Sequence, residues 1–322
     1  MRNLLFISLI IMAFSCSSTG NKTENKAETV QVSVPEFSAD TAYKFVKTQV
    51  DFGPRVPNTA QHKACGDYLV SALKQFGATV TVQEASLTAF DGTTLKSKNI
   101  IGSYNPDAET RLLLFAHWDT RPWADNDTDE KNHKTPVLGA NDGASGVGVL
   151  LEIARQLNRQ KPSVGVDIIF FDAEDYGASA GNEDSWCLGT QYWAKNKHIP
   201  NYRARYGILL DMVGAPQAKF YREQLSDNYA KYVVDKVWSK AAELGFSNYF
   251  VNKPGGAITD DHLYVNQLAG IPAIDIIQYD PYSMTGFGKY WHTTNDTMEN
   301  IDPVTLKVVG TTLLHVIFNE KP

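Results

Sequence analysis

The sequence predicts an α/β protein: a single globular domain in which a central mixed, twisted β-sheet is flanked by helices. Apolar runs rich in Val, Ile, Leu and Phe alternate along the chain with segments of helical apolar spacing, as in α/β folds. No internal repeat and no second block of composition divides the 322 residues. A hydrophobic fraction of 43% with 20% charged residues is ordinary for a globular protein.

The first half of the chain is expected to supply two helices, a hairpin and a buried strand. The helices are predicted over 41–50 and 60–76, the paired strands over 78–85 and 95–102, and the buried strand over 111–116. Ser38 or Asp40 can cap the first helix, and Gly77 ends the second. Asp91 and Gly92 are typical of the turn in a hairpin.

The second half continues the alternation of helices and strands. Its predicted elements are a helix that is opened by 139–146 and reaches 157, a strand over 166–172, a short helix over 189–195, a strand over 206–211, a helix over 227–244, a strand over 271–277 and a helix over 303–318. A loop rich in Tyr, Gly and Pro is expected over 278–290.

Carboxylates and imidazoles collect where the predicted strands end. Open α/β sheets bind ligands at the carboxyl ends of their strands, so these side chains are expected to share one crevice. Taken alone, each is more often a cap or a packing residue, but their coincidence favours a metal site, and their donor types suit zinc. The residues are His117, Asp119, Asp142, Glu174, Asp175, Asp211 and His292.

The order of these motifs resembles that of the co-catalytic zinc aminopeptidases. Five separated motifs carry the resemblance: His-x-Asp, Gly-Ala-Asn-Asp-Gly-Ala-Ser-Gly, the acid pair, the strand-end Asp and the late His-Thr. It covers the chain from about Phe45 to the C-terminus and implies the fold of that family. The implied roles are His117 and Asp211 on one metal, Asp175 and His292 on another, Asp142 as a possible bridge, Asp119 orienting His117, and Glu174 as general acid/base.

A closer resemblance within that fold is to the animal-type glutaminyl-peptide cyclotransferases. It rests on the segments 209–216, 260–262 and 291–293. These zinc enzymes convert an N-terminal glutamine into pyroglutamate and release ammonia. The resemblance implies a single zinc on Asp142, Asp175 and His292, with Glu174 moving protons and Asp211 and Asp260 as hydrogen-bonded acids beside it. The aminopeptidase family usually has Glu where this chain has the shorter Asp175.

The chemistry of amide cyclisation fits these groups. Zinc polarises a poorly electrophilic amide, and a positioned carboxylate can remove a proton from the attacking amine. The nucleophile is part of the substrate, so no protein nucleophile is needed. Aromatic walls are expected for the small pocket, and five tryptophans lie within or near the motif segments: Trp118, Trp123, Trp186, Trp193 and Trp291. Trp291, Trp193 and Trp118 are the predicted wall residues, and Trp291, next to His292, is the best candidate. His262 is expected to hold its own loop through a hydrogen bond rather than to bind metal.

Two other functions remain open at this point. A two-zinc aminopeptidase would use the same residues with an activated water. A non-catalytic binding module would require loss of the acids, which are intact. The expected partners are peptides or proteins with N-terminal glutamine. Nucleic acid is not expected, because the net charge is -6 and the chain has no block rich in Lys and Arg.

The first residues of the chain resemble a bacterial lipoprotein signal. Arg2 precedes an apolar run over 4–14, and Ser15-Cys16 follows. An ordinary secretory signal cleaved nearby is the alternative. The prediction is a lipoprotein-type signal peptide over 1–15, a flexible tether over 16–34 and a zinc-dependent catalytic domain over 35–322. The expected location is the periplasm of a Gram-negative bacterium, with membrane contact only through a lipid on Cys16.

The two remaining cysteines are expected to be buried free thiols. Export would permit a disulfide between Cys65 and Cys187, but their spacing does not indicate one. A zinc site built on cysteines is not expected, because the chain has no paired Cys spacing.

Overall fold

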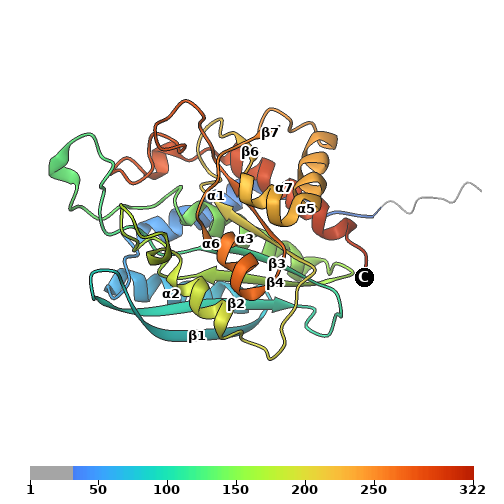
Figure 1. Cartoon of the computed structure of the whole chain (residues 1–322). Helices are drawn as coiled ribbons and strands as arrows, with labels where there is room; N and C mark the ends of the chain where they lie inside the picture. Colours follow the sequence, from blue (N-terminus) through green and yellow to red (C-terminus); the bar gives the residue numbers. More distant parts are fainter. Residues whose placement is uncertain (1–31) are drawn as a thin grey trace, which may run out of the picture. The chain divides into compact units, whose positions relative to one another are not determined.

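A six-stranded mixed sheet forms the centre of the structure (Figure 1), a computed structural model that describes residues 32–322. The pairs β1–β2 and β2–β4 are antiparallel, and the other three pairs are parallel, so the predicted mixed sheet is confirmed. In spatial order the strands are β1 (Thr79–Thr88), β2 (Thr94–Tyr104), β4 (Gly165–Phe171), β3 (Arg111–His117), β5 (Tyr206–Asp211) and β8 (Ala273–Ile277). The predicted signal peptide and nearly all of the predicted tether lie outside the described residues.

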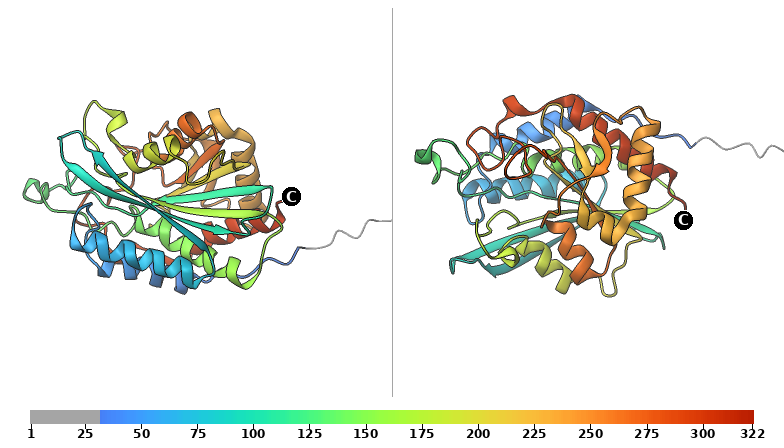
Figure 2. Two further views of the ribbon diagram at one scale, coloured as in Figure 1. Left: turned by 90° about the horizontal axis from the view of Figure 1, so that it is seen from below. Right: turned by 45° about the horizontal axis from the view of Figure 1, so that its top comes forward.

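Helices cover both faces of this sheet (Figure 2). One apolar cluster joins α1, α2, α3 and α7 to the first face, a second joins α4 and the segment after α6 to the opposite face, and α5 packs along β8. The helices are α1 (Ala39–Asp51), α2 (Ala60–Gln75), α3 (Ala144–Arg159), α4 (Leu188–Lys195), α5 (Gln224–Glu243), α6 (Asp261–Tyr264), which continues into a π-helical turn (Val265–Ala269), and α7 (Pro303–Asn319). Residues Ser33–Pro322 form one compact unit.

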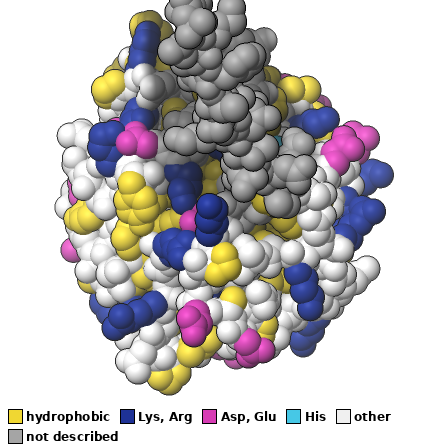
Figure 3. All heavy atoms as spheres, turned by 90° about the vertical axis from the view of Figure 1, so that its right-hand side faces the viewer, with side chains coloured by type: hydrophobic (Ala, Val, Ile, Leu, Met, Phe, Trp, Pro, Cys, Tyr) yellow, Lys and Arg dark blue, Asp and Glu magenta, His cyan; other side chains and the backbone are white. Residues whose placement is uncertain are grey.

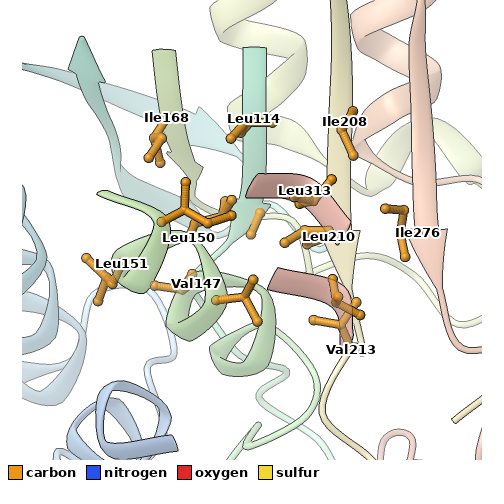
Figure 4. Packing of buried hydrophobic residues seen from close by; sticks show 14 of the residues in the cluster. Leu114, Val147, Leu150, Leu151, Ile168, Ile208, Leu210, Val213, Ile276 and Leu313 are labelled. Carbon is orange, nitrogen blue, oxygen red and sulfur yellow. The ribbon is translucent and has the colours of Figure 1, made fainter. Parts of the chain in front are cut away.

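Part of the main apolar core lies between the sheet and α3 (Figure 4). Leu114, Ile168 and Ile208 of three adjacent strands belong to one apolar cluster with Leu150 of α3, and all four side chains are fully buried. Burial of side chains of this size contributes roughly 1.5–3 kcal/mol each. This packing fixes the position of α3, whose first turn follows the glycine-rich segment 139–146.

Local sequence signals explain where the helices begin and end. The hydroxyl of Ser38 accepts a hydrogen bond from the backbone N–H of Thr41 and caps α1, and Thr59 caps α2 in the same way. Gly77 and Gly92 take positive φ angles of 77° and 85° at the end of α2 and in the hairpin, as their turns require. The predicted helices and strands are therefore confirmed, with boundaries that differ by a few residues.

Three short elements were not predicted. The strands β6 (Phe220–Arg222) and β7 (Phe250–Pro254) form a separate two-stranded sheet, and α6 has four residues. Segments this short contain too few residues for a period to be recognised, and the two strands form through long-range pairing rather than local preference. Short 3₁₀ turns occur at Glu130–Asn132, Glu183–Ser185 and Met298–Asn300.

None of the helices between residues 32 and 322 combines the length and apolar character needed to cross a membrane. On the face shown in Figure 3, Lys and Arg side chains are interspersed with Asp, Glu and uncharged side chains.

Candidate active site

Three neighbouring strands place four of the predicted site residues. The strands β4 and β3 are neighbours, and the chain leaves β3 toward α3 on one face of the sheet and leaves β4 toward α4 on the other. These diverging connections open a crevice at the carboxyl ends of the strands. His117 is the last residue of β3, and Asp211 is the last residue of β5. Glu174 and Asp175 follow the end of β4 after two connecting residues. The structure therefore brings these residues to one edge of the sheet, as the sequence predicted.

The fifth and sixth candidates complete the cluster. Asp142 lies between the two histidines: its Oδ1 is 3.0 Å from Nε2 of His117, and its Oδ2 is 3.6 Å from Nε2 of His292. Asp211 lies 3.2 Å from Nε2 of His117, and Asp175 lies 3.1 Å from Nε2 of His292. Two donor groups share Asp142, namely His117–Asp142–Asp211 and Asp142–Asp175–His292. A third donor group among the described residues, Glu174–Cys187–Asp260, does not include Asp142.

The donor atoms of both groups fit zinc. Within each group they lie within 4.8 Å of one another, and all five side chains are buried. Two carboxylates with one imidazole are donors that zinc accepts. Oδ1 of Asp175 is buried without a hydrogen bond, although it lies 3.1 Å from Nε2 of His292 and 3.6 Å from the guanidinium of Arg121. A metal ion held with His292 would satisfy this oxygen. The shorter side chain of Asp175 still reaches the immediate neighbourhood of His292.

The approach of α3 to this edge depends on glycine. A Cβ atom on Gly146 would collide with the carbonyl oxygen of Leu210 in β5, so only glycine lets the helix come this close. Gly143, the residue before α3, has a φ of 86° and lies against His117 and the backbone of Asp119. The glycine-rich segment therefore sets the distance between Asp142 and the strand ends.

Asp119 holds the turn that follows β4. Its carboxylate accepts hydrogen bonds from the backbone N–H groups of Glu174 (3.1 Å) and Asp175 (3.2 Å), and its Oδ1 is 3.6 Å from Nδ1 of His117. Ala173, at the start of the turn, has a positive φ of 55°, which is strained for a residue with a Cβ atom. The orientation of His117 by Asp119 was predicted; the two backbone contacts were not.

Three further residues around the cluster were missed by the sequence reasoning. Asp125 lies 3.5 Å from Nδ1 of His292, and Arg121 pairs with Asp125 at 2.7 Å. Asp296 accepts hydrogen bonds from the N–H groups of Asn141 and Asp142. Asp125 and Arg121 belong to a polar loop without regular spacing, and Asp296 is four residues beyond His292, so only their long-range contacts distinguish them.

Glu174 and its acidic neighbours have pKa values that are displaced upward. Burial raises the pKa of Glu174 well above its usual range, and Asp175 and Asp260 add to the effect. Burial also raises the pKa of Asp211 to about 6 and that of Asp260 to about 7. Carboxyl groups that hold protons near neutral pH are suited to general acid–base work.

These side chains open into a cavity of about 490 Å³. Its wall combines carboxylates with aromatic and apolar side chains, and it has no Lys or Arg among the described residues that line it. Trp291 stacks on His292 with ring centroids 3.8 Å apart, and the ring of Trp186 lies 6.0 Å from the same imidazole. The lining includes Asp142, Glu174, Asp175, Trp186, Asp211, Ile258, Asp260, Tyr279, Phe287, Trp291 and His292.

The prediction that Trp118 and Trp193 line the pocket is wrong. Both side chains are fully buried and belong to the two main apolar clusters. Trp118 stacks on His62, and Trp193 donates a hydrogen bond to His198. Trp118 directly follows His117, and successive side chains of an extended segment point in opposite directions. Trp193 lies in α4, where its ring packs against Phe171 and Tyr202. Trp186 takes the place beside Trp291.

The expectations for His262 and for the cysteines are confirmed. His262 is fully buried, and its Nε2 lies 3.1 Å from Glu223 rather than in either metal-type group with His117 or His292. Cys65 and Cys187 are both buried and unpaired.

The fold and this site define a class of protein: a metal-dependent α/β enzyme of the zinc aminopeptidase type. Comparison with protein families agrees, because the model of Peptidase family M28 matches residues 99–317. The chain belongs to peptidase family M28.

Solved structures and a curated relative refine the similarity. A Zn-dependent exopeptidase from Parabacteroides distasonis is 61% identical, covers 89% of this chain and 100% of its own, and superposes with a TM-score of 0.88. A glutaminyl cyclase from Bacteroides thetaiotaomicron, bound to N-acetylhistamine, is 58% identical, with 90% and 100% coverage and a TM-score of 0.88. The glutaminyl-peptide cyclotransferase of Drosophila melanogaster is 27% identical over 78% of this chain and 73% of the relative.

These findings confirm the resemblances stated from the motifs. The similar proteins are enzymes, they include glutaminyl cyclases and an exopeptidase, and the family and its neighbours imply a zinc site. The fold prediction is confirmed at the same time.

Proposed function

We propose that this protein is a glutaminyl-peptide cyclotransferase that converts the N-terminal glutamine of peptides or proteins into pyroglutamate and releases ammonia. The observation that carries the proposal is the position of Glu174: it lines the same cavity as the Asp142–Asp175–His292 group and Trp291. The similarity to the Bacteroides glutaminyl cyclase supports the choice of reaction.

In this proposal Asp142, Asp175 and His292 would hold one zinc ion. When bound there, zinc would supply a Lewis acid that polarises the γ-amide carbonyl of the substrate. The carboxylates that line the cavity without a compensating Lys or Arg favour a substrate that arrives with a free α-amino group. Trp291 and Trp186 would enclose the glutamine side chain and exclude water.

Glu174 would move the protons. The α-amino nitrogen forms a bond to the γ-carbonyl carbon, and the bond from that carbon to the amide nitrogen breaks. Glu174 takes a proton from the attacking amine and returns one to the leaving ammonia. Its raised pKa lets the carboxyl group hold that proton between the two steps. Asp211 and Asp260, whose pKa values are raised to about 6 and 7, would share hydrogen bonds beside it.

The test uses purified protein and peptides that begin with glutamine. The proposal expects ammonia and a product lighter by one ammonia, without shortening of the peptide. The Glu174→Gln variant is expected to retain zinc and lose turnover. Release of a free amino acid from the same peptides would reject the cyclotransferase.

The second candidate is a two-zinc aminopeptidase, and one observation favours it. His117 and Asp211 form a complete second donor group with Asp142, so a second ion has ligands available. Metal analysis of the pure protein separates the two: one zinc per chain agrees with the cyclotransferase, and two with the aminopeptidase. Hydrolysis of amino-acid amides is an independent test, because only the aminopeptidase is expected to release free amino acids from them.

We also propose that the protein is exported and held at a membrane by a lipid on Cys16. The support comes from the order of Arg2, an apolar run and Ser15-Cys16. Metabolic labelling with a radioactive fatty acid, compared between wild type and Cys16→Ala, tests this. Wild-type protein that takes up no label would reject the lipid anchor.

A further inference from the structure

Cys187 contacts the carboxyl group to which the proposed mechanism assigns proton transfer. Its Sγ lies 3.3 Å from Oε1 of Glu174, within hydrogen-bond distance for a thiol. No other side chain in the described range 32–322 donates a hydrogen bond to this carboxyl group. The other oxygen, Oε2, lies 3.9 Å from Nδ1 of His117. The two oxygens of Glu174 thus have different neighbours.

The backbone holds Cys187 in this position independently of its thiol. The N–H of Cys187 donates to the carbonyl oxygen of Glu174, and the N–H of Leu188 donates to that of Ala173, both at 3.0 Å. Gly189 packs so tightly on the carbonyl oxygen of Asp172 that a Cβ atom would collide with it. The start of α4 is therefore attached along the turn that carries Glu174.

The thiol is in the right state to donate. Cys187 is fully buried, and burial together with the charge of Glu174 raises the pKa of the thiol well above its usual range. The group is therefore S–H rather than a thiolate. A neutral thiol is a weak donor, so it can orient a carboxylate without strongly stabilising its charged form. A general base needs that combination, because orientation helps proton transfer and loss of basicity hinders it.

We propose that Cys187 is a positioning residue for Glu174. Its thiol donates a hydrogen bond to Oε1 and so limits rotation of the carboxyl group about the Cγ–Cδ bond of Glu174. The other oxygen, Oε2, is thereby kept beside His117 in one fixed orientation. This inference rests on the proposed role of Glu174. It assigns Cys187 no contact with substrate, and it is separate from the zinc ligands.

The test compares three single variants. Cys187→Ala removes the donor and leaves the backbone contacts, and alanine tolerates the positive φ of 55° at this position no worse than cysteine does. Cys187→Ser keeps a donor. Cys65→Ala removes the other buried thiol, which lies in α2 away from Glu174, and is the matched control. Each variant is checked for thermal stability and zinc content before kinetics.

For Cys187→Ala we expect kcat to fall about tenfold with KM changed less than about twofold, because the lost contact orients a reacting group rather than binds substrate. Cys187→Ser is expected to recover kcat to within about threefold of wild type, since a hydroxyl also donates. Cys65→Ala should keep the wild-type kcat. A folded, zinc-replete Cys187→Ala with wild-type kcat overturns the proposal, and so does loss of zinc in that variant, because the thiol would then be a ligand.

A spectroscopic measurement makes the outcome independent of turnover. The infrared S–H stretching band of Cys187, assigned by difference from Cys187→Ala, should shift when Glu174 is replaced by Gln. An unshifted band means that the thiol makes no hydrogen bond to this carboxyl group and overturns the proposal. Kinetics are run with both glutamine peptides and amino-acid amides. If the proposed reaction is wrong, the wild-type protein does not cyclise glutamine peptides. If only the proposed role of Cys187 is wrong, the wild type is active and Cys187→Ala has the same kcat.

Discussion

Replacing Glu223 by Gln tests whether one buried carboxylate stabilises the pocket wall. Glu223 caps α5 and accepts hydrogen bonds from the backbone N–H groups of Leu225 (2.8 Å) and Ile258 (3.0 Å), while its other oxygen lies 3.1 Å from His262. Ile258 lines the cavity, and His262 follows the two acids at the start of α6. The carboxylate therefore joins a helix to the segment that forms one side of the site.

The magnitude follows from the pKa of this group. Burial alone would raise it, but His262 and the backbone donors prevail and lower the pKa of Glu223 from 4.5 to about 2. At about 1.4 kcal/mol per pKa unit, the ionised group contributes about 3 kcal/mol to the free energy of unfolding at neutral pH. Because the folded-state pKa is the lower one, this stabilisation is fully present above pH 4.5 and is lost as the pH falls toward 2.

The assay is urea unfolding at neutral pH and again near pH 3. Glu223→Gln is expected to be less stable than wild type by about 3 kcal/mol at neutral pH, and the difference should shrink at the acidic pH. Glu243→Gln, at the exposed end of the same helix, should change stability by less than about 1 kcal/mol. A difference between wild type and Glu223→Gln that stays the same at both pH values would mean that ionisation of Glu223 does not stabilise the fold.

Three further predictions concern the site. Glu174→Gln should lower kcat by roughly 10²–10⁴-fold with unchanged zinc content, measured by steady-state kinetics and metal analysis; a loss of zinc instead would make Glu174 a ligand. Treatment with a chelator should abolish activity, and zinc should restore it in wild type but not in His292→Ala; restoration in both would remove His292 from the ligand set. Trp291→Ala should raise KM with little change in stability, whereas Trp193→Ala should cost about 3–5 kcal/mol of stability, since only Trp193 is fully buried. Equal thermal shifts in the two tryptophan variants would contradict this assignment.

Much of the fold could be predicted because the signals are local. The apolar run 168–171 and the acids that follow it indicate a buried strand with polar residues at its end, and β4 and its turn agree. Gly77, Gly92 and Ser38 mark turns and caps by backbone geometry that depends on one or two residues. The order of the strands in the sheet is not contained in such signals, because it depends on which distant segments pair.

The same distinction between local and long-range signals applies to the residues of the site. Its metal-binding residue types and their order along the chain could be identified from the sequence, together with a possible acid/base in Glu174. The supporting residues Asp125, Arg121 and Asp296 could not, because each acts through a contact that is distant in the sequence. Asp125 lies beside His292, Arg121 donates to the carbonyl oxygens of Asp175 and Gly177, and Asp296 accepts from the backbone N–H of Asn141. The same holds for the assignment of tryptophans to core or pocket, where the direction of each side chain decides.

Composition, apolar period and the order of motifs are enough to assign the class of the fold, the family resemblance and the residues that can hold a metal. The position of Asp142 between His117 and His292, and the contact of the Cys187 thiol with Glu174, are seen only in the folded chain. The physical reason is the crevice beside β3: it brings together residues that are far apart in the chain, and distances between them exist only after the sheet has formed.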